Sequence, residues 1–129
     1  MREILIQTDF NEMILQDKVV LFFYHKWSKY SGVYGIQYLK EADSFLCNQK
    51  NIAEINFWIA DVSDENSSAS FLCDWIKNNS VESNLFVWIG AGNPTVVWLN
   101  YGQTLNCEFS AYILKTEGII QKTVEYFNL

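Results

Sequence analysis

Two stretches of this chain have the composition of β-strands that are covered on both faces. Residues 18–24 form a near-continuous run of β-branched and aromatic side chains, and residues 55–62 read as a second central strand. Strands that are hydrophobic on both faces are typical of parallel sheets, in which helical crossovers cover the two sides. The chain is therefore expected to fold around an α/β sheet.

The segments around these strands predict a β-α-β-α-β-α-β-β-α order. The short apolar run at residues 4–6 comes first, and Thr8 or Asp9 can cap the helix that follows it. A second helix is expected from Ser31 and a third after residue 70. The predicted inward-facing side chains are Val33, Ile36, Leu39 and Leu46, with Phe45 beside them, and then Phe71, Leu72, Trp75 and Ile76.

The C-terminal third predicts a β-hairpin and a closing helix. Residues 95–99 and 104–109 read as strands on either side of a turn at residues 100–103. The last helix is expected to start near Thr116, with Ile120, Val124 and Phe127 on one face. The early crossovers imply parallel pairing and the hairpin an antiparallel edge, which gives a mixed central sheet with helices on both faces. A length of 129 residues suits one domain over residues 1–129.

Charge and cysteine content narrow the classes of function. The net charge of −6 disfavours nucleic-acid binding and would suit a basic protein partner, although modest acidity also simply favours solubility. No apolar stretch has the length of a signal peptide or a membrane span. The three cysteines are widely spaced and odd in number, which favours reduced thiols in the cytoplasm. The sequence carries no signal that specifies an oligomeric state.

Three local features resemble the thioredoxin family. A buried strand leads through Trp27 into a helix, as the family's second strand does. Asn93 and Pro94, followed by an apolar strand, look like the family's cis-proline segment, and Pro94 is the only proline in the chain. Residues 100–103 resemble its hairpin turn. The resemblance implies a thioredoxin-like three-layer α/β/α sandwich with a mixed central sheet and a C-terminal β-hairpin plus helix.

The same resemblance implies that the family's redox chemistry has been lost. That chemistry needs a thiolate at a helix N-terminus and a resolving thiol three residues later. Here Ser28 and Ser31 stand at those positions, in a Trp-Ser-Lys-Tyr-Ser segment that replaces Trp-Cys-x-x-Cys. The resemblance also places Phe22 at the family's buried aspartate and Ile59 at or near its partnering lysine. We therefore expect no enzymatic activity and no cofactor.

A binding surface is the function that the resemblance leaves open. In the family, the loop before the helix and the cis-proline loop form a shallow groove that takes an extended peptide, and this groove does not need cysteine. In the alternative interpretation, Trp27 packs against the sheet and Pro94 serves folding alone. The candidate binding residues are Trp27, Ser28, Lys29, Tyr30, Ser31, Asn93 and Pro94.

Ser28 admits two further interpretations. Serine is a common helix cap, and Ser28 stands where the helix is expected to begin. It could also be a nucleophile activated by His25, but no carboxylate lies adjacent in sequence to orient the imidazole. Residues 61–67 are rich in oxygen ligands but lack the glycine and the closing glutamate of a calcium loop, and no residue spacing indicates a zinc site.

The leading hypothesis is thus a non-catalytic protein that binds another protein or a peptide, as an adaptor or chaperone-like subunit would. A second hypothesis is an acidic immunity or inhibitor protein that neutralises a basic partner such as a toxin nuclease. A third is a redox protein that uses a relocated cysteine. Cys47, Cys73 and Cys107 are the candidates, although none sits at a predicted helix N-terminus or in a Cys-x-x-Cys motif.

Overall fold

The structure is a computed structural model that describes residues 1–52, 54–63, 72, 75, 78, 94–108 and 111–129. Its strands are β1 (Arg2–Glu3), β2 (Val19–Tyr24), β3 (Asn56–Asp61), β4 (Thr95–Asn100) and β5 (Gln103–Glu108). Its helices with described bounds are α1 (Gln7–Met13), the π-helix η1 (Lys29–Gly35), α2 (Ile36–Cys47) and α5 (Ala111–Tyr126).

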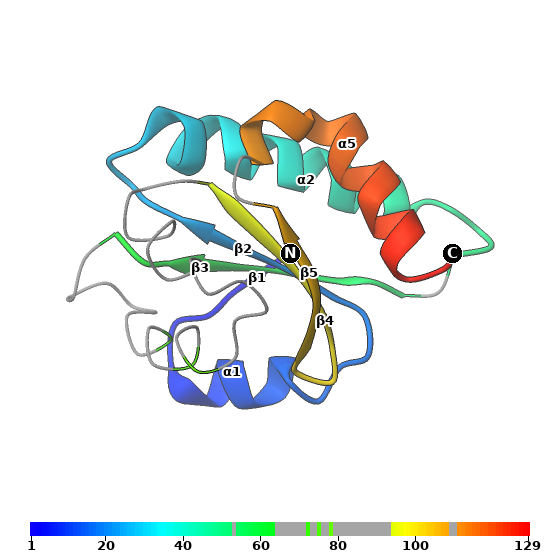
Figure 1. Cartoon of the computed structure of the whole chain (residues 1–129), viewed down its shortest axis with the longest axis horizontal. Helices are drawn as coiled ribbons and strands as arrows, with labels where there is room; N and C mark the ends of the chain where they lie inside the picture. The colour runs from blue at the N-terminus through cyan, green and yellow to red at the C-terminus, as the bar shows by residue number, and fades with distance from the viewer. Residues whose placement is uncertain (53, 64–71, 73–74, 76–77, 79–93, 109–110) are drawn as a thin grey trace.

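The five strands form one mixed sheet in the order β1-β3-β2-β4-β5. β1 and β2 both pair with β3 in parallel, whereas β4 is antiparallel to β2 and β5 is antiparallel to β4. Helices α2 and α5 cover one face of the sheet, and α1 lies on the other (Figure 1). The predicted mixed sheet between helical layers is confirmed.

The sheet has a hydrophobic core on each face, which explains why all six residues of β2 are buried. Alternate side chains of a strand point to opposite faces. Leu21 therefore packs with Met13 on the α1 side, while Phe22 packs with Leu39 on the side of α2 and α5. Leu72, which belongs to the predicted third helix, has helical backbone and is buried on the α1 side.

The predicted hairpin is confirmed at the level of single residues. Asn100 pairs with Gln103 across the turn. Tyr101 and Gly102 both have positive φ values, 49° and 79°. Positive φ at both central residues is the geometry of a two-residue type I′ turn, whose twist matches that of the flanking strands.

Two predictions for the N-terminal segment are wrong. The first strand is Arg2–Glu3 and not residues 4–6, because the chain leaves the edge of β3 after Ile4 and Ile6 already begins the helix as its N-cap. Neither Thr8 nor Asp9 is the cap residue. Asp9 lies within the first turn, and its carboxylate accepts the Leu5 and Ile6 amides at 3.0 and 3.2 Å.

The predicted inward face of the second helix is only partly correct. Leu39 and Leu46 are buried, but Val33 is exposed. Val33 lies in the π-helix η1, where i→i+5 hydrogen bonds change the angle between successive residues, so the 3.6-residue spacing does not extend back to it. Phe45, which was expected beside this face, is exposed.

The closing helix agrees with its predicted start. α5 has a non-helical residue, Lys115, with φ of 55°, and uninterrupted helix runs from Thr116. Ile120, Val124 and Phe127 pack against the core on that face.

Phe71 and Ile76 of the predicted third helix lie outside the described residues. None of the helices that the structure describes is long and apolar enough to cross a membrane.

Candidate functional site

The Trp-Ser-Lys-Tyr-Ser segment follows the end of β2, and two serine hydroxyls shape it. The Ser28 hydroxyl accepts the Ser31 amide at 3.3 Å, as an N-cap does. The buried Ser31 hydroxyl accepts the His25 amide at 2.7 Å. Within the described chain, the Ser28 side chain has that one hydrogen-bond partner, which supports capping over the interpretation of a nucleophile paired with His25.

Replacing Ser31 by alanine should lower the free energy of unfolding by about 1–3 kcal/mol, because it leaves the buried His25 amide without its acceptor. Ser28→Ala is the matched comparison and should cost about 1 kcal/mol, the usual loss for a serine cap. Urea unfolding of the two variants measures the difference. A Ser31→Ala variant as stable as the wild type would contradict this role for the hydroxyl.

The same segment is anchored to the end of β3 through Ser63. The Lys26 amide donates to the Ser63 hydroxyl at 2.8 Å, and the Trp27 indole donates to the Ser63 carbonyl at 3.2 Å. Asp61 in turn accepts both the amide and the hydroxyl of Ser63, at 3.1 and 2.5 Å. The segment after β2 is therefore fixed by contacts with residues more than thirty positions away.

Asp61 is a buried carboxylate at the base of this anchor. Burial is the largest single effect and raises its pKa, but the Ser63 hydroxyl, the Ser63 amide and Lys26 together lower that pKa below its ordinary value. The Lys26 ammonium lies 3.3 Å from the carboxylate and is itself well exposed. Asp61 is therefore expected to be ionised at neutral pH and to hold Ser63 in place.

Several large side chains on this segment point into solvent, and we call them the aromatic surface. They are Trp27, Tyr30, Val33 and Tyr34, with exposed fractions of 63%, 57%, 57% and 45%. The rings of Tyr30 and Tyr34 lie 6.1 Å apart. Trp27 packs one side of its ring against the buried His25, at 5.1 Å, yet most of its surface remains exposed.

Sequence reasoning included Trp27 and Tyr30 but missed Val33 and Tyr34. Helical spacing predicts that Val33 belongs to the core, and no motif in the sequence singles out Tyr34. The signal that could have found them is their position three and four residues after Tyr30, which puts them near it on a helical surface. Lys29 is exposed beside them, whereas Ser31 is buried and cannot contact a partner directly.

Pro94 lies at the same end of the sheet as the aromatic surface. Thr95 of β4 pairs with Phe23 of β2, so one further step along this antiparallel ladder puts Pro94 level with Tyr24. Pro94 is buried. Asn93, and with it the bond that joins it to Pro94, lies outside the described residues.

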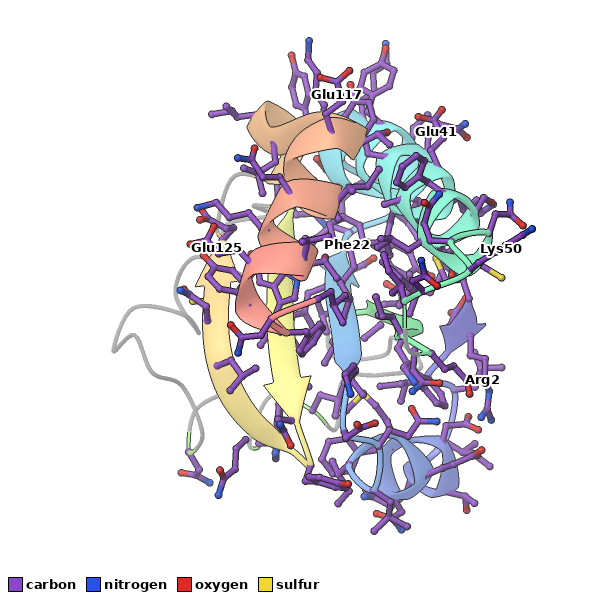
Figure 2. All side chains as sticks on the ribbon, turned by 90° about the vertical axis from the view of Figure 1, so that its right-hand side faces the viewer. Arg2, Phe22, Glu41, Lys50, Glu117 and Glu125 are labelled. Atoms are coloured by element: carbon purple, nitrogen blue, oxygen red, sulfur yellow. The ribbon has the colours of Figure 1, made fainter. Side chains whose placement is uncertain are left out.

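The positions that the resemblance assigned to an aspartate and a lysine are apolar and adjacent. Phe22 and Ile59 pair across β2 and β3, and both side chains belong to the core beneath α2 and α5. Figure 2 shows Phe22 between the sheet and these helices. Neither of these two side chains has an ionisable group that could transfer a proton.

The described residues include no cluster of three histidine, cysteine or acidic side chains that could hold a metal ion. Cys47 is an exposed free thiol and Cys107 a buried one. Cys73 and residues 64–67 of the calcium-like segment lie outside the described residues.

Comparisons with known proteins identify the fold. No protein-family model and no curated protein matches the sequence. Among solved structures, oxidised thioredoxin from Plasmodium falciparum is 15% identical, with a TM-score of 0.66 over 98% of this chain and 97% of that one. Thioredoxin from Malassezia sympodialis is 13% identical, with a TM-score of 0.61 over 98% and 90%. Human ERp44 in its zinc-bound form is 12% identical, with a TM-score of 0.64 over 97% of this chain and 31% of that one. These likenesses confirm the predicted thioredoxin-like fold.

Proposed function

We propose that this chain, which has a thioredoxin-like fold, binds a protein partner through the aromatic surface and catalyses no thiol–disulfide exchange. The observation that carries the proposal is that Trp27 and Tyr30 are more than half exposed, and Tyr34 nearly half, on an anchored backbone. Exposed aromatic groups of this kind mark interaction sites, and Trp and Tyr are enriched among the residues that dominate binding energy.

The anchoring of the segment supports a role in binding, because it holds the aromatic surface in one conformation. Lys26 and Trp27 are tied to Ser63, and the serine at each end of the turn holds a backbone amide. A surface that is ordered before binding loses less conformational entropy on association. An extended segment of the partner is the ligand we propose, since it can lie along the end of the sheet between the aromatic surface and Pro94.

The absence of redox catalysis is proposed on chemical grounds. The two positions that would carry thiols carry hydroxyls, and both hydroxyls accept backbone amides. Phe22 and Ile59 supply no proton carrier beneath them. We also propose that the protein resides in the cytoplasm, a location that the free thiols of Cys47 and Cys107 support.

Binding can be tested with a partner captured from the native host. The Trp27→Ala, Tyr30→Ala double variant should bind that partner at least about 30-fold more weakly, since hot-spot aromatics contribute about 2 kcal/mol or more. Isothermal titration calorimetry with the purified partner measures the change.

Tyr101→Ala is the matched control for binding. Tyr101 is an exposed tyrosine at the hairpin turn, at the opposite end of β4 from Pro94. Its loss should leave the affinity unchanged. An unchanged affinity in the double variant, or an equal loss in Tyr101→Ala, would show that the aromatic surface is not the binding site.

The non-catalytic part of the proposal predicts that the protein does not accelerate insulin disulfide reduction by dithiothreitol. Turbidity from the precipitating insulin chain reports the rate. Turnover that disappears in Cys47→Ser would instead indicate a redox protein with a relocated cysteine, because Cys47 is the exposed thiol of the described chain.

A further inference from the structure

The aromatic surface consists of two parts that are held by different elements. Trp27 belongs to the segment after β2, and the Lys26 amide and the Trp27 indole tie that segment to Ser63. The other members of the aromatic surface belong to η1, which continues directly into α2. The spacing between Trp27 and the two tyrosines therefore depends on how η1 packs against residues 25–27.

Gly32 is the residue of η1 at which the two parts meet. A Cβ atom at residue 32 would lie 2.7 Å from the His25 carbonyl oxygen, and 3.3 Å from both the Cα atom and the carbonyl oxygen of Lys26. All three are backbone atoms, so no side-chain rotation could make room for the added carbon. The neighbouring Ser31 hydroxyl accepts the His25 amide at 2.7 Å. The backbone of η1 thus lies directly against that of His25 and Lys26.

The segment on which Gly32 packs is held in place by the end of the sheet. The Tyr24 carbonyl accepts the Val62 amide at 3.0 Å, and the Ser63 hydroxyl accepts the Lys26 amide at 2.8 Å. His25 between them is buried. A side chain at residue 32 would therefore displace η1 rather than the segment, and the tyrosines would move relative to Trp27.

We propose that Gly32 is a positioning residue for the aromatic surface. Its missing side chain sets the spacing between Trp27 and the two tyrosines, and one segment of the partner contacts both parts at once. This inference rests on the proposed function, since it needs the partner to bind at the aromatic surface. A surface that is ordered before binding loses affinity when its parts are displaced, even though every aromatic side chain is still present.

Gly32→Ala tests the proposal with the purified partner captured from the native host. It should weaken binding at least about tenfold in isothermal titration calorimetry, as expected for parts that act together. In a Trp27→Ala background the same change should weaken binding less than about twofold, because only the part on η1 then remains. An equal loss in both backgrounds would overturn the proposal.

NMR of the free protein gives a measurement that needs no partner. The Tyr30 and Tyr34 rings, whose centroids are 6.1 Å apart, should keep their mutual NOEs in Gly32→Ala because both belong to η1. The His25 amide signal should shift, because its hydrogen bond to the Ser31 hydroxyl joins the segment to the displaced helix. An unchanged His25 amide signal would show that η1 has not moved and would also overturn the proposal.

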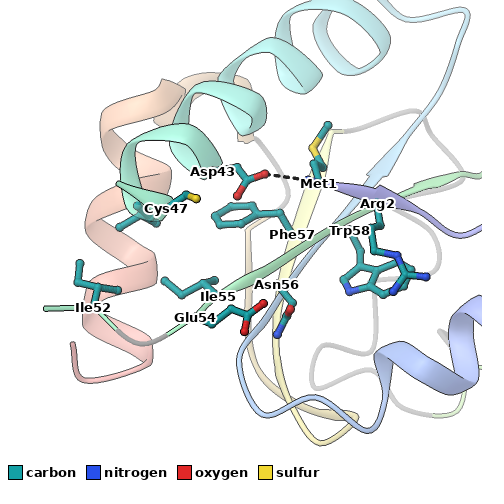
Figure 3. Close-up of a pocket in the computed structure, with 11 residues that line it drawn as sticks. Met1, Arg2, Asp43, Cys47, Ile52, Glu54, Ile55, Asn56, Phe57 and Trp58 are labelled. Atoms are coloured by element: carbon teal, nitrogen blue, oxygen red, sulfur yellow. Dashed lines mark ion pairs between the residues drawn. The ribbon is translucent and has the colours of Figure 1, made fainter. Parts of the chain in front are cut away.

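Two controls lower stability at the other end of the sheet. β2 and β3 run in parallel, so the start of β3 lies far from the aromatic surface, which follows the end of β2. Ile55 packs against the core there and lines a pocket of about 560 Å³ between the start of β3 and the end of α2 (Figure 3). Ile55→Ala removes this packing, and Gly102→Ala places a side chain at a φ of 79°.

Both controls should lower the midpoint of urea unfolding and leave the affinity for the partner unchanged. A tenfold loss of affinity in either control would show that stability, and not the spacing set by Gly32, determines binding.

The outcomes separate this inference from the proposed function. If the Trp27→Ala, Tyr30→Ala double variant binds as the wild type does, the proposed function fails and this inference fails with it. If the double variant loses affinity while Gly32→Ala does not, the proposed function stands and the positioning role of Gly32 alone is wrong.

Discussion

Replacing Gly35 by alanine should destabilise the protein by about 1–3 kcal/mol, the usual cost of forcing an extra carbon into a packed core. The backbone at Gly35 is helical, with φ of −60°, so alanine would otherwise stabilise the position by up to about 1 kcal/mol. The packing around residue 35 decides whether alanine stabilises or destabilises the protein. A Cβ atom at residue 35 would lie 2.5 Å from Cζ of Phe22 and 2.9 Å from the Tyr30 carbonyl.

A second substitution, at Phe22, tests whether its ring is the main cause of the destabilisation by Gly35→Ala. Phe22→Leu removes the ring atoms that meet the new methyl group. We therefore expect Gly35→Ala, Phe22→Leu to be more stable than the sum of the single effects by about 1 kcal/mol or more. The rescue should be partial, because the Tyr30 carbonyl is backbone and stays in place. Urea unfolding of the four proteins completes the double-mutant cycle.

Lys40→Ala is the control for this cycle, since Lys40 is exposed on α2 and its loss should change stability by no more than about 0.5 kcal/mol. Strict additivity of the Gly35 and Phe22 changes would contradict the proposed clash. Phe22 extends as far as the start of α2, where glycine leaves room for its ring.

The sheet could be predicted from the sequence because its signals are local. All six residues of β2 are aliphatic or aromatic and all six are buried, so the composition of one short run indicates a strand covered on both faces. Gly102 at the hairpin is likewise a local signal, because glycine readily takes one of the two positive φ values of this turn. The fold class and the hairpin register follow from such signals without knowledge of any distant contact.

The site was predicted less well because its geometry depends on distant residues. Helical spacing assigned Val33 to the core, but the segment is a π-helix, and no local sequence signal indicates that change. The anchor of Trp27 on Ser63 joins positions 36 residues apart. The requirement for glycine at position 35 depends in the same way on Phe22, which belongs to a different element.

Asp61→Asn should lower the free energy of unfolding at neutral pH by about 2 kcal/mol, the usual contribution of hydrogen bonds to a buried charged group. The carboxylate accepts both donors of Ser63, and Ser63 holds Lys26 and Trp27. The change should therefore also shift the NMR signal of the Trp27 indole N–H. The substitution thus tests stability and the order of the aromatic surface together.

The pH dependence of this difference has a defined sign. The folded-state pKa of Asp61 lies below its ordinary value of 3.8, so its contribution is fully present above that value and is lost as pH falls through the folded-state pKa. The gap in stability between wild type and Asp61→Asn should be constant from about pH 7 to pH 5 and should close below about pH 4. Urea unfolding at a series of pH values measures it.

Two further variants separate the Ser63 hydrogen bonds from the ion pair with Lys26. Lys26 is 72% exposed in its side chain, so Lys26→Ala should cost no more than about 1 kcal/mol. Glu117→Gln removes an exposed carboxylate of α5. Its difference in stability from the wild type should not change at acid pH as that of Asp61→Asn does. If Lys26→Ala proved as costly as Asp61→Asn, the ion pair rather than Ser63 would hold the segment. A gap that persisted unchanged to pH 2 would exclude the ionised carboxylate as its cause, because the contribution of a carboxylate with a lowered pKa must shrink once the unfolded state binds a proton below about pH 3.8.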